Sequence, residues 1–148
     1  MKKLITLLSL LLLTVSLSAD ERHITFGELP KNAKIFVLTY FKDIPFKEVI
    51  IERRASLAQY EVVLENGLKL QFDRVGLCTE IDAKRGFVPD EVMPKKIVST
   101  VTKYFPDNRI KKFENNGRMY EIKLEDGTTL TFNTTLRLVD VDVDDSEE

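Results

Sequence analysis

The chain has 148 residues, of which 43% are apolar and 31% are charged, with one Cys, one His and no Trp. This composition is typical of one ordinary globular domain or two very small ones, and it excludes disordered and fibrous chains. A single Cys excludes an internal disulfide and a multi-thiolate metal centre, and a single His excludes a multi-histidine metal site.

The chain begins with the three-part pattern of a secretory signal peptide. Two lysines precede an almost wholly apolar run at residues 4–17, and small residues follow it. The run is shorter than the about 20 apolar residues that a spanning helix needs, which disfavours an uncleaved membrane anchor. Cleavage after Ser18 fits the small-residue rule better than cleavage after Ala19 does. We assign residues 1–19 to the signal peptide and expect a periplasmic or secreted protein, soluble and without stable membrane insertion after cleavage.

The charge of the remaining chain is acidic. From Asp20 onward there are 22 − 2 = 20 basic and 24 acidic residues, a net formal charge near −4. Such a chain has no general attraction to nucleic acid or anionic lipid, and no nucleic-acid partner is expected. Cys78 stands alone in an oxidising compartment, and we expect a buried, unreactive thiol there.

The chain after the signal contains two copies of one sequence pattern. At a shift of 64 residues, Leu29-Pro30-Lys31 and Tyr40-Phe41 recur as Met93-Pro94-Lys95 and Tyr104-Phe105. At a shift of 60 residues, Tyr60-Glu61, Gly67 and Phe72 recur as Tyr120-Glu121, Gly127 and Phe132. The change of shift predicts four extra residues in the first copy, around residues 53–57. We expect residues 20–82 to form the first copy and residues 83–148 the second, which ends in an acidic tail.

Each copy is predicted to begin with an amphipathic helix. Apolar residues recur every three or four positions within residues 29–41 and 93–105, which makes one apolar stripe on each helix. Pro30 and Pro94 suit the first helical turn, where no N–H partner is needed.

A four-stranded antiparallel meander is predicted after each helix. Strict alternation within residues 60–72 and 120–132 predicts hairpins with one buried and one hydrated face. Their turns contain Asn66-Gly67 and Asp126-Gly127, which accept positive φ at both central positions. The fold class is therefore α+β, a tandem repeat of a helix plus a four-stranded antiparallel meander, with both helices on one face of an extended sheet.

Tandem helix-and-hairpin units of this size resemble the PepSY-like family, also described as similar to the beta-lactamase inhibitor protein. The resemblance is carried by residues 29–41 with 60–72 and by residues 93–105 with 120–132, which is nearly the whole chain after the signal. It implies a periplasmic, non-enzymatic α+β protein, in a family whose members are often supposed to bind or inhibit other envelope proteins.

The sequence holds no recognisable catalytic constellation. His23 follows directly after the signal, Cys78 has no second His to activate it, and there is no Gly-rich phosphate loop. We expect neither an enzyme nor a cofactor.

The acidic tail is a weak candidate for a calcium site. Alternation with Val places Asp140, Asp142 and Asp144 on one side of a strand, and carboxylate oxygens are ligands that calcium prefers. The central Gly and terminal Glu of an EF-hand loop are missing. An edge strand kept from aggregating by its charge is the preferred interpretation, and no metal ligand set is assigned.

The open face of the predicted sheet remains as the candidate partner-binding surface. Its expected contact residues, including two from the lengthened hairpin, are Arg53, Arg54, Glu61, Lys69, Gln71, Glu121, Lys123, Thr129 and Thr131. The leading hypothesis is a periplasmic non-catalytic binding module that inhibits or senses an unknown envelope protein through this face. The alternative is a calcium-responsive or structural envelope protein that uses the acidic C-terminal strand.

Overall fold

The computed structural model describes residues 20–54 and 57–145, so the predicted signal peptide lies outside the described residues. The elements in chain order are β1 Asp20–His23, α1 Lys31–Tyr40, β2 Phe46–Arg54, β3 Leu57–Leu64, β4 Leu68–Phe72, β5 Cys78–Ala83, α2 Lys95–Tyr104, β6 Ile110–Asn115, β7 Met119–Leu124, β8 Thr129–Asn133 and β9 Leu138–Asp142. Two single-turn 3-10 helices, η1 Phe26–Glu28 and η2 Asp90–Val92, precede α1 and α2.

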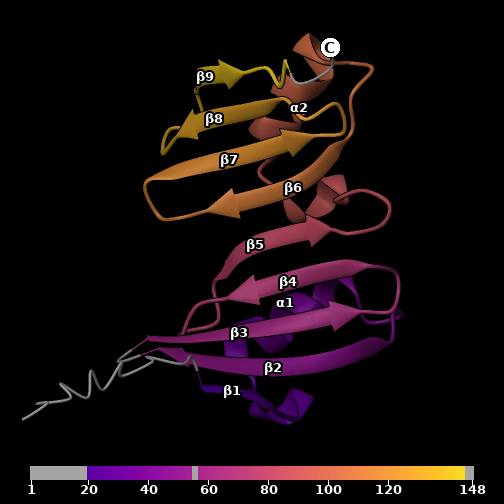
Figure 1. Ribbon diagram of the computed structural model, residues 1–148, viewed down its shortest axis with the longest axis vertical. Helices are drawn as coiled ribbons and strands as arrows, with labels where there is room; N and C mark the ends of the chain where they lie inside the picture. Colours follow the sequence, from indigo (N-terminus) through magenta and orange to yellow (C-terminus); the bar gives the residue numbers. More distant parts are fainter. Residues whose placement is uncertain (1–19, 55–56, 146–148) are drawn as a thin grey trace, which may run out of the picture.

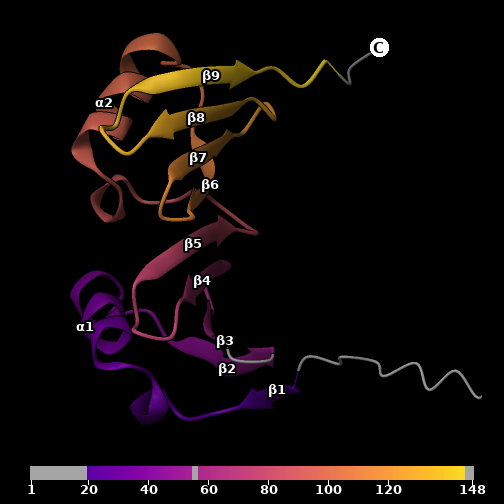
Figure 2. The ribbon, with the colours of Figure 1, turned by 90° about the vertical axis from the view of Figure 1, so that its left-hand side faces the viewer.

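The nine strands form one antiparallel sheet whose spatial order is the chain order. Short connections explain this order, because each strand can pair with the one before it. Both helices lie on the same face of the sheet, and the other face is left open (Figures 1 and 2). Each helix is followed by a four-stranded meander, β2–β5 after α1 and β6–β9 after α2, which confirms the predicted fold class.

The extended sheet was predicted from the sequence, but β1 and the identity of the strands that join the two copies were not. β1 has four exposed residues without alternation, and it pairs along β2 at one edge, with His23 opposite Ile50. In the middle of the sheet, β5 pairs with β6, with Ile81 opposite Phe113. This second pairing joins the two halves into a single sheet, and β5 runs across the expected boundary between residues 82 and 83.

The two prolines lie immediately before the helices rather than inside the first turn. Pro30 and Pro94 have extended backbone, with ψ of 147° and 129°. Their carbonyl oxygens accept helical N–H bonds from Lys34 at 3.1 Å and from Val98 at 3.3 Å. The prolines therefore mark the helix starts, as predicted, with a displacement of the size usual at helix ends.

The core lies between the helices and the sheet. Ala33 and Val37 of α1 and Ile97 and Val101 of α2 are buried against it. The inward strand positions supply most of the large buried side chains, which are Leu64, Leu70, Phe72, Ile122, Leu124, Leu130 and Phe132. Each such burial stabilises the fold by about 2 kcal/mol relative to an exposed side chain. The alternation read from the sequence is thus confirmed.

The turns of the β3–β4 and β7–β8 hairpins differ from the predicted geometry. Only the glycines have positive φ, 92° at Gly67 and 89° at Gly127, so the expectation for Asn66 and Asp126 is wrong. Each glycine N–H donates to the carbonyl oxygen three residues earlier, at 3.1 Å. Each side-chain oxygen at 66 and 126 accepts the N–H two residues later, at 3.1 and 2.9 Å. These bonds favour a three-residue loop with a type I turn followed by a glycine bulge.

The extra residues of the first copy lengthen the β2–β3 hairpin. The pair Val49–Val62 in the first half corresponds to the pair Phe113–Ile122 in the second. Beyond it, the β2–β3 ladder has five further pairs and the β6–β7 ladder has two. The insertion therefore extends one arm of the sheet, as the change of shift predicts.

Candidate binding surface

The open face is built by the outward positions of the strands, since side chains alternate between the two faces. It carries seven of the residues expected there, which are Glu61, Lys69, Gln71, Glu121, Lys123, Thr129 and Thr131. Glu61 is opposite Gln71 in the first half, and Glu121 is opposite Thr131 in the second. The two copies therefore present equivalent positions on one continuous surface.

A row of acidic side chains crosses the middle of this face. Gln71 is opposite Glu80, Glu80 is opposite Glu114, and Glu114 is opposite Glu121. Three carboxylates on the neighbouring strands β5, β6 and β7 are thus direct cross-strand partners. Like charges placed directly opposite each other destabilise a sheet. The repulsion within this row, which we call the acidic row, therefore works against folding.

Lys112 on β6 offsets part of this repulsion. Its Nζ lies 3.6 Å from Oε1 of Glu80 and 3.2 Å from Oε1 of Glu114. Burial raises the pKa of Glu80. The nearby Lys112 lowers this pKa, and the neighbouring Glu114 raises it further, so that the pKa of Glu80 lies above its usual value. Burial lowers the pKa of Lys112, but its bonds to the two carboxylates outweigh burial, so that this pKa is raised. Glu121 has no ion pair with another described residue.

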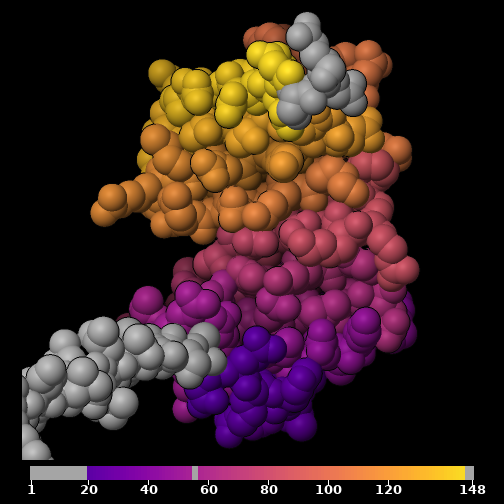
Figure 3. Space-filling view, in the orientation of Figure 1, coloured from indigo at the N-terminus to yellow at the C-terminus, as the bar shows by residue number. Residues whose placement is uncertain are grey.

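A groove of about 460 Å³ opens over the acidic row. Besides the row itself, Gln59 of the lengthened hairpin lines it. Leu57 and Met119, at the tips of the two hairpins, form an apolar part of its wall and are 70% and 39% exposed. In Figure 3 the surface is hollowed at the left, between the orange β6–β7 hairpin and the magenta surface below it. We call this hollow the central groove, and it combines carboxylates and amides with an exposed apolar rim.

A chain of hydrogen bonds fixes the surface beside the central groove. Gln59 Nε2 donates to Gln71 Oε1 at 2.6 Å, and Gln71 Nε2 donates to Glu61 Oε2 at 3.3 Å. Lys69 Nζ lies 3.0 Å from the same carboxylate oxygen. Burial lowers the pKa of Lys69, but the bond to Glu61 and the nearby carboxylates outweigh it and raise that pKa. These residues line a second hollow of about 210 Å³ that shares Gln59 and Gln71 with the central groove.

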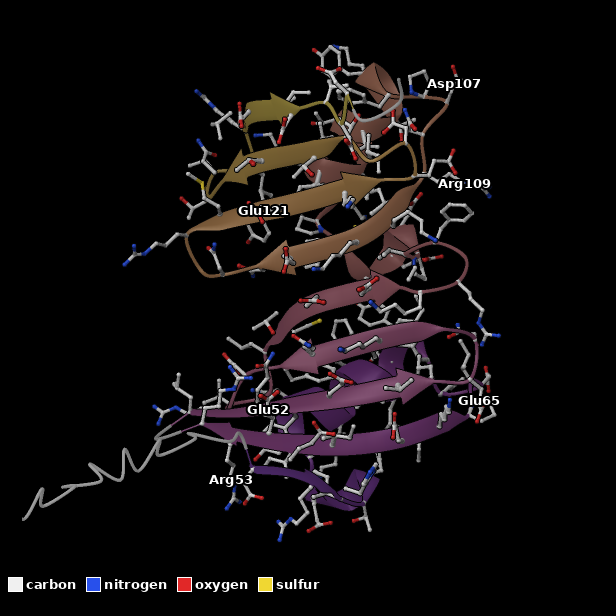
Figure 4. The ribbon with its side chains drawn as sticks, viewed as in Figure 1. Glu52, Arg53, Glu65, Asp107, Arg109 and Glu121 are labelled. Atoms are coloured by element: carbon white, nitrogen blue, oxygen red, sulfur yellow. The ribbon has the colours of Figure 1, made fainter. Side chains whose placement is uncertain are left out.

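The two arginines of the lengthened hairpin lie on different sides of the sheet. Arg54 is on the open side, where its Nε is 2.8 Å from Oε1 of Glu52. Arg53 precedes it on the same strand and therefore projects to the other side, away from the labelled Glu52 (Figure 4). The structure thus brings Arg54 but not Arg53 to the open face, and neither lines the central groove.

Sequence reasoning missed several residues of the groove, among them Gln59, Leu57 and Met119 and, most important for its charge, Glu80 and Glu114. The two glutamates lie on β5 and β6, and alternation inside one hairpin gives no information about the pairing that joins the two copies. The signal that could have found them is the burial of their neighbours. Ile81 and Phe113 are both buried core residues, so the residue before the first and the residue after the second must face outward.

The acidic C-terminal candidates lie at the far edge of the open face. Asp140 is opposite Thr131 and Asp142 is opposite Thr129, so both project from the same side of β9. Asp144 follows β9, and its side chain lies beside Gly127. Among residues 20–54 and 57–145, no group of three or more His, Cys, Asp or Glu side chains is placed to hold a metal ion.

None of the helices in the described part of the chain is long and apolar enough to span a membrane. Residues 58–140 match a protein-family model described as "Putative beta-lactamase-inhibitor-like, PepSY-like". No similar sequence is found among the curated proteins.

Several solved structures are similar to this one. A structure from Bacteroides vulgatus, described as a "putative periplasmic protein" of the DUF2874 family, is 32% identical, with a TM-score of 0.78, and the match covers 83% of this chain and 97% of that chain. A structure from Bacteroides thetaiotaomicron, described as a "putative calcium-regulated periplasmic protein", has the same identity and coverage and a TM-score of 0.80. A second protein from Bacteroides vulgatus is 24% identical, with a TM-score of 0.77 over 83% of this chain and 99% of that chain, and shares the fold.

Proposed function

The chain belongs to the PepSY-like family, and on that premise we propose that it is a periplasmic, non-catalytic module that binds a partner envelope protein through its open sheet face. The periplasmic assignment is supported by the descriptions of two relatives that are 32% identical. Within the proposal, the central groove is the contact site, and Arg54 lies on the same face, opposite Leu57 in the lengthened hairpin. Inhibition or sensing of the partner is the consequence of that contact.

The acidic row is the observation that carries this proposal. Three carboxylates are directly opposed in the groove, and the one lysine among them, Lys112, pairs with Glu80 and Glu114 and leaves Glu121 without an ion pair to another described residue. Residues that oppose folding concentrate where a protein functions. A basic side chain of a partner would relieve the repulsion, and the apolar rim at Leu57 and Met119 would cover an adjacent apolar residue. The partner therefore presents a basic segment with at least one apolar side chain.

Site-specific photo-crosslinking in the native envelope tests this proposal. A photo-reactive residue replaces Gln59 in the central groove, and the control replaces Thr102, which is exposed on α2 at the opposite side of the molecule. A crosslinked partner is expected from the groove position and not from the helix position. Crosslinks to the same protein from both positions, or from neither, would contradict the assignment to the open face.

Charge substitutions distinguish a specific contact in the central groove from nonspecific binding. Glu114→Gln combined with Glu121→Gln should reduce the crosslink yield, because the groove then offers the basic segment of the partner two fewer carboxylates. The control is Glu91→Gln, an exposed acid in η2 on the connection before α2. If the captured partner is an enzyme, its turnover should fall on stoichiometric addition of the wild-type protein, and fall less with the double variant.

A calcium-responsive role is the second candidate function. It is supported by the description of the Bacteroides thetaiotaomicron relative and by the pair Asp140 and Asp142 on one side of β9. Two carboxylates beside two threonines would need further oxygen ligands from water or from a partner to reach the six to eight that calcium takes. Calorimetry with calcium, compared with Asp140→Asn/Asp142→Asn, tests this role. Absence of heat and an unchanged melting temperature would eliminate it.

A further inference from the structure

The helical side of the molecule carries charge of the opposite sign to the acidic row. α1 and α2 together contain five lysines, Lys31, Lys34, Lys95, Lys96 and Lys103, and neither helix contains Asp or Glu. Both helices have lysine in the first turn and no acid there. Cations at a helix N-terminus are unfavourable, because they face the positive end of the helix dipole. Lys34 and Lys96 also donate to the carbonyl oxygens of Gly27 and Thr135, at 3.1 and 3.3 Å, whereas no such structural bond accounts for Lys31 among the described contacts.

Four exposed apolar side chains distinguish the first helix region from the second. Ile35 and Leu38 on α1 are 51% and 54% exposed, and Val75 and Leu77 in the β4–β5 loop are 50% and 58% exposed. The loop rests against the start of α1, where Asn32 Nδ2 donates to the carbonyl oxygen of Val75 at 3.1 Å.

The equivalent positions of the second half are all polar. At the shifts of 64 and 60 residues, Ile35, Leu38, Val75 and Leu77 correspond to Ser99, Thr102, Thr135 and Arg137. The backbone is the same in both places, since Lys96 Nζ donates to the carbonyl oxygen of Thr135 at 3.3 Å, as Asn32 does to that of Val75. The fold therefore does not require apolar residues at these positions, and the second half serves as an internal control.

We propose that α1 and the β4–β5 loop attach the protein to an anionic phospholipid surface. Ile35, Leu38, Val75 and Leu77 enter the headgroup region. Lys31, the first residue of α1, and Lys42, two residues after its end, are both exposed and pair with lipid phosphates around them. An interfacial helix combines these features, an apolar face for the acyl boundary and lysines at its margin. Each basic residue near an anionic membrane contributes about 1 kcal/mol of attraction. The net charge near −4 does not oppose this contact strongly, because the acidic row lies on the open face and α1 covers the opposite face of the sheet (Figure 2), and salt screens charges that are far apart.

Two other occupants, a second copy of this chain and a different protein, fit these observations less well. A second copy packed on the same patch in antiparallel fashion would place Lys31 of one molecule beside Lys42 of the other. Four apolar side chains are also few for a stable protein interface, which engages about 20–30 residues on each side. A lipid surface needs no complementary shape, so a small convex patch is sufficient. In this orientation the central groove points away from the membrane and stays free for its partner (Figure 2).

Vesicle co-sedimentation of the secreted protein, with its leader removed, tests the proposal. Every helix and strand of the structure lies after residue 19, so this form retains the complete fold. We expect binding to vesicles of phosphatidylglycerol and phosphatidylcholine at low salt, and much weaker binding to phosphatidylcholine alone. Absence of binding to the anionic vesicles would overturn the proposal and would leave an acidic protein as the occupant.

The equivalent residues of the second half define the substitutions for the test variant. I35S/L38T/V75T/L77R replaces the four apolar side chains with their own counterparts, and these exposed positions should leave the melting temperature almost unchanged. The variant should lose most of the vesicle binding, and K31Q/K42Q should bind about thirtyfold more weakly than the wild type. Wild-type binding by either variant would overturn the proposal. E114Q/E121Q should bind vesicles normally, which separates this surface from the partner-binding face.

Discussion

Gly76 and Leu136 occupy the same position in two equivalent turns, and both have left-handed backbone, with φ of 87° and 61°. In each turn this residue donates its N–H to the carbonyl oxygen three positions earlier, at 3.0 Å for Gly76 and at 2.9 Å for Leu136. The turn geometry is thus set by the backbone bonds of the repeat and does not itself require glycine. The first turn needs glycine for another reason, which is the close approach of α1.

Gly76→Ala should be strongly destabilising. A Cβ at this position would lie 2.6 Å from the backbone nitrogen of Ala33 and 2.9 Å from Cβ of Pro30, so the loop and the start of α1 must separate. Backbone strain and overpacking together predict a loss of about 3 kcal/mol in the free energy of unfolding. Urea denaturation followed by circular dichroism measures this loss.

Gly86→Ala is the matched control. Gly86 also has positive φ, 70°, but an added Cβ would meet nothing within 4 Å. Only the strain of a left-handed alanine remains, about 1 kcal/mol. Equal losses in the two variants would show that the contact with α1 does not constrain Gly76.

Asp73 is expected to hold the β4–β5 loop rather than to bind a partner by its charge. Its Oδ1 accepts the N–H groups of Val75 at 3.0 Å and Leu77 at 2.9 Å, and Asn133 Oδ1 makes the equivalent two bonds in the second half. Asp73→Asn keeps the accepting oxygen and should change stability by less than about 0.5 kcal/mol. Asp73→Leu loses both bonds and should cost about 2 kcal/mol. Thermal melting of the two variants checks the difference, and equal melting temperatures would refute this role.

Most of the fold could be predicted because each copy repeats strong local signals. Alternation fixed which side of the hairpins is buried, and the prolines marked the helix starts. The repeat itself located the insertion, since two copies of one pattern show where one is longer. β1 could not be predicted, because its four exposed residues have no apolar pattern and it pairs along β2 at the edge of the sheet.

The candidate site was predictable only within each copy. Gln71 and Glu121 lie on hairpins with clear alternation, and both line the central groove. The groove depends equally on Glu80 and Glu114, which meet only through pairing between β5 and β6. Which strands pair between the two copies depends on how both halves pack around one core, and the local sequence of either copy gives no information about this pairing. Arg53 was expected among the contact residues, and the structure places it on the side opposite to Arg54, because both belong to β2 and consecutive strand residues alternate between the faces.

The thiol of Cys78 should react slowly in the folded protein. It is half-buried against the core, and burial raises its pKa to about 12. Because the thiolate is the reactive form, an aromatic disulfide reagent at about pH 8 should label the native protein far more slowly than the urea-unfolded protein. Absorbance of the released thiol follows the reaction. Equal labelling rates in the two states would show that this side chain is accessible and ionised.

Glu80→Gln should stabilise the protein at neutral pH. Burial and the opposed Glu114 raise the pKa of Glu80, so the folded state binds this proton more tightly than the unfolded state does. The stability gained from protonation is present at acid pH and is lost as the pH rises through the folded pKa. Removing the charge should therefore add about 0.5 kcal/mol to the free energy of unfolding at about pH 7, the usual size of one cross-strand charge pair.

The same substitution should have almost no effect at about pH 4, where the wild-type carboxyl is largely protonated. Lys112 keeps its partner Glu114 in the variant, so no uncompensated lysine opposes the gain. Glu61→Gln is the matched control and should lower the free energy of unfolding at neutral pH, because Glu61 pairs with Lys69 and accepts a hydrogen bond from Gln71. Urea denaturation of both variants at the two pH values measures these differences. A loss of stability at neutral pH in Glu80→Gln would mean that Lys112 outweighs the repulsion, and the acidic row would then be an ordinary ion-pair network.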